Sequence, residues 1–116
     1  MANLDDSQRT KKPRSIWLDK DVNTEAGGKL LKQILPDSKF PYPKPVGLLK
    51  KIFQIATNEN SIILDSFSGS ATTAHAVLEL NKEDGGNRKF ILVEQEDYAK
   101  TITAENLKGK FICQSL

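Results

Sequence analysis

The sequence predicts an open parallel α/β sheet flanked by helices, half of a doubly wound fold. Two short apolar runs, residues 62–65 and 90–94, are typical of strands, and each ends in an acid. A stretch rich in helix formers, residues 71–81, separates them. A strand, a crossover helix and a second strand in this order predict a right-handed parallel unit. Because the runs are continuously apolar, we expect strands that are buried on both faces.

Further helices are predicted on either side of this unit. The run EAGGKLLKQIL has the spacing of a short amphipathic helix, and a proline ends it. A second helix is expected over residues 45–57, since Pro45 suits the first helical position and apolar residues then recur at helical spacing. The run EDYAKTITAENLK predicts a third helix, with Tyr98 and Ile102 facing inward.

Length and composition are those of one small soluble domain. The chain has 116 residues and a formal net charge of +2, so charge alone does not indicate a nucleic-acid partner. We expect residues 1–14 to be a disordered polar tail and residues 15–116 to form one partial domain. The single cysteine, Cys113, fits a reducing compartment, and no long apolar span or secretory signal is visible. These features predict a cytoplasmic protein with no membrane partner.

The segment DSFSG places an acid directly before a loop of small residues. In open parallel sheets, ligands bind outside the carboxyl ends of the strands. Asp65 closes the first predicted strand there, and Glu94 closes the second. Gly69 lets the backbone turn sharply, and the helix that begins near Ala71 offers free N–H groups. The sequence therefore predicts a ligand site between two carboxylates.

The residue types in this loop favour a cationic ligand over a phosphate. A phosphate-binding loop needs a lysine followed by Ser or Thr, and a dinucleotide site needs G-x-G-x-x-G; neither is present. A pyrophosphate beside Asp65 would cost on the order of 1 kcal/mol or more. S-adenosylmethionine carries an ammonium and a sulfonium, so Asp65 and the loop amides suit its amino-acid end, and Glu94 suits its ribose. Two alternatives stay open: an ordinary turn capped by Ser68 or Ser70, and a solvated Glu94.

Several motifs together resemble those of the DNA amino-methyltransferases. DSFSGSATTAHAVLELN resembles their D-x-F-x-G-S-G-T-T loop, and FPYPKPVGLLKKI resembles the Y-P-K-P segment that precedes this loop in the permuted beta class. SIWLD and GGNRKFILVEQEDYAKTI match further motifs in order. Within this group, the sequence most resembles the adenine-modifying subunit of Type III restriction–modification systems. It implies a partial Rossmann-like sheet of the class I methyltransferases, with motif X over residues 45–57, motif I over 62–71 and motif II over 90–94.

The resemblance implies a set of residues that bind S-adenosyl-L-methionine as cofactor, with no metal and no catalytic residue in this chain. The residues expected to line the methionine side of the cofactor are Asp65, Phe67, Gly69 and Ser70. Thr72 is expected to support the loop. Those expected at the ribose and at the adenine are Glu94 and Gln95. Those expected to complete the wall are Lys44 and Pro45.

The family transfers a methyl group to N6 of adenine in a nucleotide flipped out of the duplex. This sequence departs from it in two ways. Ala71 stands where the family usually has a third glycine, which we expect to weaken cofactor binding. The chain also has no D-P-P-Y-type tetrad, which in the family contacts the target amine and lies upstream. We therefore expect the cofactor-binding portion of a site-specific DNA adenine-N6 methyltransferase that is inactive alone.

The resemblance implies double-stranded DNA, the missing N-terminal half and a restriction subunit as partners. An exposed strand edge also favours a homo-oligomer. Two other functions stay open: a non-catalytic nucleotide-binding module of similar sheet order, and a degenerate remnant that binds no ligand. Structural roles are expected for the remaining candidates. We expect His75 to pack, Trp17 and Phe40 to form walls of the core, and Lys50 and Lys51 to face solvent.

Overall fold

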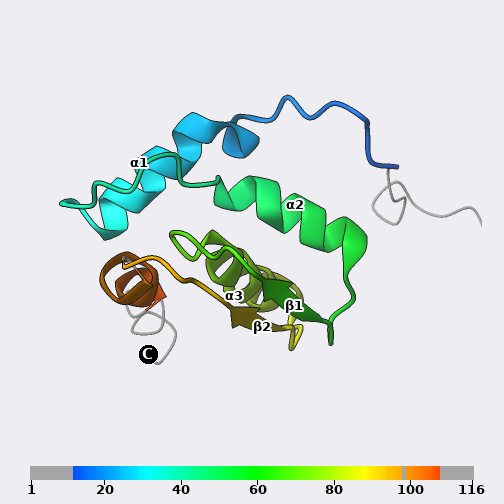
Figure 1. Cartoon of the computed structure of the whole chain (residues 1–116). Helices are drawn as coiled ribbons and strands as arrows, with labels where there is room; N and C mark the ends of the chain where they lie inside the picture. The colour runs from blue at the N-terminus through cyan, green and yellow to red at the C-terminus, as the bar shows by residue number, and fades with distance from the viewer. Residues whose placement is uncertain (1–11, 98, 108–116) are drawn as a thin grey trace, which may run out of the picture.

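The described strands form a two-stranded parallel sheet. The structure is a computed structural model, and it describes residues 12–97 and 99–107. Strand β1 (Ile62–Asp65) pairs in parallel with strand β2 (Lys89–Leu92). Helix α3 (Thr72–Asp84) connects the two strands (Figure 1). The predicted order of strand, crossover helix and strand is confirmed.

Further helical segments surround this unit. They are the 3₁₀ helix η2 (Lys20–Val22), α1 (Thr24–Ile34), α2 (Val46–Ala56) and the π-helix η3 (Ala99–Thr103). The Asn23 side chain caps α1 by accepting a hydrogen bond from the backbone of Ala26. Pro45 stands one residue before α2, so the predicted helix over residues 45–57 is confirmed within one residue at each end. In Figure 1, η3 lies beside the loop that leaves β1.

The core lies between α2, α3 and one face of the sheet. Val46 and Phe53 of α2 pack against buried residues of α3, and the sheet contributes Ile63 and Phe90. The α3 residues in this cluster are Ala76, Val77 and Leu80. Full burial of a valine, leucine or phenylalanine side chain, as in Val77, Leu80 and Phe53, contributes about 1.5–3 kcal/mol. Both helices therefore belong to one layer on the same side of the sheet.

The opposite face of the sheet is exposed. Its apolar side chains are Ile62, Leu64, Ile91 and Val93, each between 51% and 66% exposed. Leu64 and Ile91 are paired in register, so they lie on the same face. The prediction of strands buried on both faces is wrong for the described part of the chain, where only one face carries a helix layer. An apolar sheet face of this kind is a surface on which a further layer can pack.

The second strand is also shorter than predicted. It ends at Leu92, so Glu94 lies two residues beyond it rather than at its end. The backbone N–H of Val93 still donates to the carbonyl of Asp65 at 2.9 Å. This bond keeps the chain after β2 close to the end of β1.

Lys50 bridges α2 and α3, so the expectation that it faces solvent is wrong. Its ammonium contacts the carboxylates of Glu83 and, at 3.6 Å, Glu79. Burial lowers the pKa of Lys50, but these two carboxylates outweigh it and hold the pKa above its ordinary value. His75 is packed, as predicted, and its Nε2 lies 2.8 Å from Oε1 of Glu79. The charged groups here join two helices.

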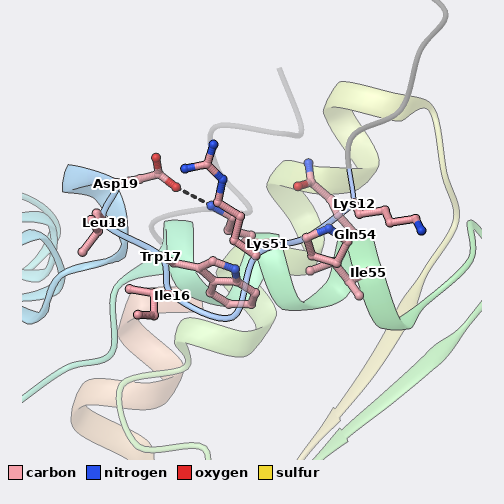
Figure 2. A pocket seen from close by; sticks show the side chains of 10 residues that line it. Lys12, Ile16, Trp17, Leu18, Asp19, Lys51, Gln54 and Ile55 are labelled. Carbon is pink, nitrogen blue, oxygen red and sulfur yellow. Dashed lines mark hydrogen bonds and ion pairs between the residues drawn. The ribbon is translucent and has the colours of Figure 1, made fainter.

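Lys51 holds the segment around Trp17 and Asp19 against the outer side of α2, so the expectation that its side chain faces solvent is also wrong. It pairs with Asp19, and its ammonium lies 5.2 Å from the centre of the Trp17 ring (Figure 2). A contact of this kind contributes about 0.5–1 kcal/mol at an exposed site. Trp17 and Lys51 line a surface hollow of about 570 Å³ together with Gln54 and Ile55 of α2. Trp17 therefore packs on the outside of this helix.

The exposed sheet face predicts self-association of the isolated chain. We expect Leu64→Thr to reduce it, because the substitution removes apolar surface and keeps a residue that suits a strand. Light scattering measures the change, and urea unfolding should show a stability within about 0.5 kcal/mol of the parent. The matched control is Ile63→Thr on the covered face, which should lower the free energy of unfolding by about 2 kcal/mol or more. A monodisperse monomer of the parent chain would contradict this prediction.

Candidate active-site loop

Asp65 organises the loop that follows β1. Its Oδ1 accepts a hydrogen bond from the backbone N–H of Phe67 at 3.0 Å. Its Oδ2 accepts one from the Thr73 hydroxyl at 2.6 Å. The carboxylate thus closes the first turn of the loop and joins it to the first turn of α3.

Glu94, two residues beyond the end of β2, holds the same loop from the other side. Its Oε2 accepts the backbone N–H of Gly69 at 2.9 Å, and its Oε1 accepts those of Gln95 at 2.9 Å and Glu96 at 3.1 Å. The N–H groups of Glu96, Gly69 and Gln95 hold the pKa of Glu94 below its ordinary value. Glu94 is therefore ionised at neutral pH and anchors the loop across the end of the sheet.

The loop amides donate to acceptors within the protein. Besides Phe67 and Gly69, the N–H of Ser68 donates to the Val93 carbonyl at 3.1 Å, and that of Ala71 donates to the Ser68 carbonyl at 2.8 Å. These four N–H groups stabilise the fold of the loop, so the expectation that they bind the amino-acid end of a ligand is wrong for them. A phosphate-binding nest needs such N–H groups turned outward. These four N–H groups are therefore not available to bind an anion.

Two residues of the loop adopt a left-handed backbone conformation. Gly69 has φ = +52°, and a Cβ there would lie 3.0 Å from Cζ of Phe40. Ala71 has φ = +64°, which costs a non-glycine residue about 1–2 kcal/mol. Its methyl group is fully buried, so its consequence is backbone strain and not a narrower ligand space.

The alternative of a serine-capped turn is wrong. Helix α3 begins after Ala71, and no side chain caps it. Ser68 and Ser70, the two predicted caps, are both buried. The Ser70 hydroxyl instead lies 3.0 Å from that of Thr72. The loop is stabilised by contacts to other elements.

The structure separates the predicted cofactor-binding residues into accessible and buried ones. Those that are exposed or half-buried are Lys44, Asp65, Phe67, Gly69, Glu94 and Gln95. Those that are buried are Pro45, Ser70 and Thr72. The accessible residues form the candidate ligand surface, and the buried ones can support it only from beneath.

The proline-rich segment before α2 lies against this loop. Phe40 contacts Gly69, as the close approach to its ring shows. Lys44 borders a very small hollow that Ser70, Thr72 and Asn106 also line. The structure thus brings the predicted wall segment and the loop together. Phe40 is half-buried and packs here, consistent with its expected role as a wall residue.

Sequence reasoning missed two residues that contact the loop. The Thr103 hydroxyl donates to the carbonyl of Gly69, and Nδ2 of Asn106 donates to the carbonyl of Ser70. Both side chains are buried, although we had expected Tyr98 and Ile102 to face inward. Ile102 is half-buried, and Tyr98 lies outside the described residues. No local pattern marks these two residues, because their partner carbonyls lie 34 and 36 positions away in the chain.

Among residues 12–97 and 99–107, no group of His, Cys, Asp and Glu side chains is arranged to hold a metal ion. None of the helices in the same residues is both long enough and apolar enough to cross a membrane.

A parallel sheet whose strand ends carry two carboxylates around a tight loop is typical of α/β domains that bind nucleotide-derived cofactors. Comparison with known families is more specific. The family model described as DNA methylase, that of the N6/N4 methyltransferases, matches residues 2–105. The chain belongs to this DNA methylase family. Membership implies a Rossmann-like methyltransferase fold, of which the described sheet is a part.

The chain is similar to several restriction–modification proteins. It is 42% identical over 88 residues to the Type III restriction-modification enzyme EcoPI Mod subunit of Escherichia phage P1, covering 76% of this chain and 14% of that protein. It is 45% identical over 80 residues to the StyLTI Mod subunit of Salmonella typhimurium, covering 69% and 12%. Identity to the Type II methyltransferase M.KpnI of Klebsiella pneumoniae is 37% over 94 residues, covering 81% and 22%. The chain thus spans less than a quarter of the length of these relatives.

Because Ala71 has a left-handed conformation, glycine at this position and glycine at the buried Ala74 should change the free energy of unfolding differently. Ala71→Gly should leave the chain at least as stable as the parent, because relief of about 1–2 kcal/mol of strain outweighs the loss of about 0.8 kcal/mol from one buried methyl group. Ala74→Gly, inside α3, should destabilise by about 1 kcal/mol or more. Urea unfolding of both variants measures the difference. Equal destabilisation by both would contradict the strain at Ala71.

Proposed function

We propose that the chain is the S-adenosylmethionine-binding portion of a DNA adenine-N6 methyltransferase of a restriction–modification system. The proposal also holds that the tetrad contacting the target amine is supplied by residues outside these 116. The observation that carries it is the pair of carboxylates, Asp65 and Glu94, around a loop in which four backbone N–H groups already donate within the protein. Such a site offers acceptors to a ligand and few donors.

The acceptor-rich site suits S-adenosylmethionine. Its ammonium and ribose hydroxyls are hydrogen-bond donors, and its sulfonium is a cation. A carboxylate can accept about four hydrogen bonds. Asp65 receives one at each oxygen, and Oε2 of Glu94 receives one, so both retain capacity for a ligand. A pyrophosphate would meet two negative charges, each costing on the order of 1 kcal/mol or more.

Each accessible residue would contact a different part of the cofactor. Asp65 would accept hydrogen bonds from the ammonium, and Glu94 from the ribose hydroxyls. Phe67, which is 83% exposed, would cover an apolar part of the ligand, with Gln95 beside the adenine and Lys44 in the wall. Support from beneath would come from Pro45, Ser70 and Thr72. When bound, the cofactor supplies the activated methyl group.

The remaining parts of the reaction would come from elsewhere. The printed names of the relatives are those of Mod subunits and DNA methyltransferases, and each is several times longer than the segment it shares with this chain. We infer that double-stranded DNA is bound by the assembled enzyme, and that a restriction subunit is a further partner. The exposed sheet face, with Leu64 and Ile91, would receive the other half of the methyltransferase.

Calorimetry tests the proposed cofactor. S-adenosylhomocysteine should give binding heat and NAD none, since only the second carries a pyrophosphate. Asp65→Asn should weaken binding about 10-fold or more, because it removes a charge-assisted hydrogen bond to the ammonium. The matched control is Asp97→Asn, an exposed acid further along, which should bind like the parent. Preferential binding of NAD would favour the nucleotide-binding module, and binding of neither ligand would favour a degenerate remnant.

Reconstitution tests the division of the catalytic machinery. The purified chain should transfer no methyl group from labelled S-adenosylmethionine to DNA. Adding an upstream methyltransferase segment that carries the D-P-P-Y-type tetrad should produce N6-methyladenine. The same segment with its tetrad aspartate replaced by alanine is the control. Methyl transfer by this chain alone would overturn the assignment of the catalytic residues.

A further inference from the structure

We propose that Thr103 and Asn106 are positioning residues for the cofactor loop. By holding two successive carbonyls, those of Gly69 and Ser70, they set the loop conformation that S-adenosylmethionine meets. This inference rests on the proposed function. It concerns residues that act through the loop and not by touching the ligand.

The side chains that support this inference are buried, the Asn106 bond is buried, and the Thr103 bond is partly buried. Thr103 is 7% exposed and Asn106 is 4% exposed, and each donates a hydrogen bond to a loop carbonyl. A buried carbonyl that loses its donor also loses the compensation for its desolvation. The backbone of Gly69 is held at both polar groups, its N–H by Glu94 and its carbonyl by Thr103. The two peptide planes on either side of the Gly69 Cα therefore have little freedom to rotate.

The helix that carries both donors is unusual. η3 is a π-helix, a form that is rare and often occurs at functional sites, and residues 104–107 continue it as ordinary helix. Side chains three positions apart lie on the same helix face. Thr103 and Asn106 therefore point to one side and match two consecutive carbonyls. A pair of contacts fixes the orientation of the loop, where one contact would fix only its distance.

The backbone of the loop requires such support. Gly69 and Ala71 have positive φ angles, and Ser70 lies between them. A strained segment keeps its conformation only where its surroundings determine it. The bonds from Thr103 and Asn106 fix the two peptide planes that join these residues. Without them, the Gly69 N–H would leave Glu94, and the carboxylate expected at the ribose would lose its position.

The connection between β2 and η3 places ligand binding and loop support in one segment. Glu94 lies five residues before Ala99, the first residue of η3. The same short stretch thus carries the carboxylate expected at the ribose and the donors that hold the loop.

The test compares isosteric variants by calorimetry with S-adenosylhomocysteine. Thr103→Val removes the hydroxyl and keeps the shape, so affinity should fall about 5- to 20-fold. Thr103→Ser keeps the donor and should bind within about 2-fold of the parent. The matched control is Thr101→Val, an exposed threonine of the same segment, which should bind like the parent. Asn106→Leu is an independent second variant, expected to weaken binding similarly, and it decides the test if Thr103→Val does not fold.

A second readout does not depend on the ligand. Hydrogen exchange of the Gly69 amide, followed by NMR well below the unfolding temperature, should accelerate in Thr103→Val and not in Thr103→Ser. Parent-like affinity in folded Thr103→Val and Asn106→Leu would overturn the inference. If the parent chain binds no S-adenosylhomocysteine, the proposed function fails first. Faster Gly69 exchange in Thr103→Val would then still support the positioning contact, and unchanged exchange would overturn it.

Discussion

The loop between β1 and α3 keeps its shape because two carboxylates accept its amide protons. Asp65 binds the first turn from its own strand, and Glu94 reaches the glycine from the neighbouring one. Only parallel pairing brings the ends of both strands to one edge of the sheet, so the site depends on that pairing. The same bonds define the chemistry. Four loop amides donate within the protein, so the proposed ligand would meet the remaining acceptor capacity of the carboxylates.

Segments far apart in the sequence support this loop. Phe40, in the proline-rich segment, packs against Gly69 from one side. Thr103 at the end of η3 and Asn106 just after it hold two loop carbonyls. These contacts offset the strain energy of the positive φ at Ala71, a conformation that glycine adopts without steric cost. A loop whose conformation is fixed by contacts from several segments is pre-organised, and pre-organisation lowers the entropy cost of binding a ligand.

The single helix layer is the other main feature of the molecule. α2 and α3 cover one face of the sheet, and the apolar residues of the other face remain exposed. A doubly wound methyltransferase sheet carries helices on both faces. The matched relatives are several times longer than the segment they share with this chain. Both observations support the proposal that the exposed face receives the other half of the methyltransferase.

The sequence by itself determined the local features of this protein. The order of strand, helix and strand and the bounds of α2 follow from apolar spacing and from proline, which act over a few residues. The acid and the glycine that identify the loop are local signals too. The tertiary structure alone decided which sheet face is covered, that Lys50 bridges two helices, and that Ala71 is strained. It also decided that Thr103 and Asn106, 34 and 36 positions from their partners, support the loop. Those outcomes depend on which distant donor meets which acceptor, and no local pattern in the chain encodes that.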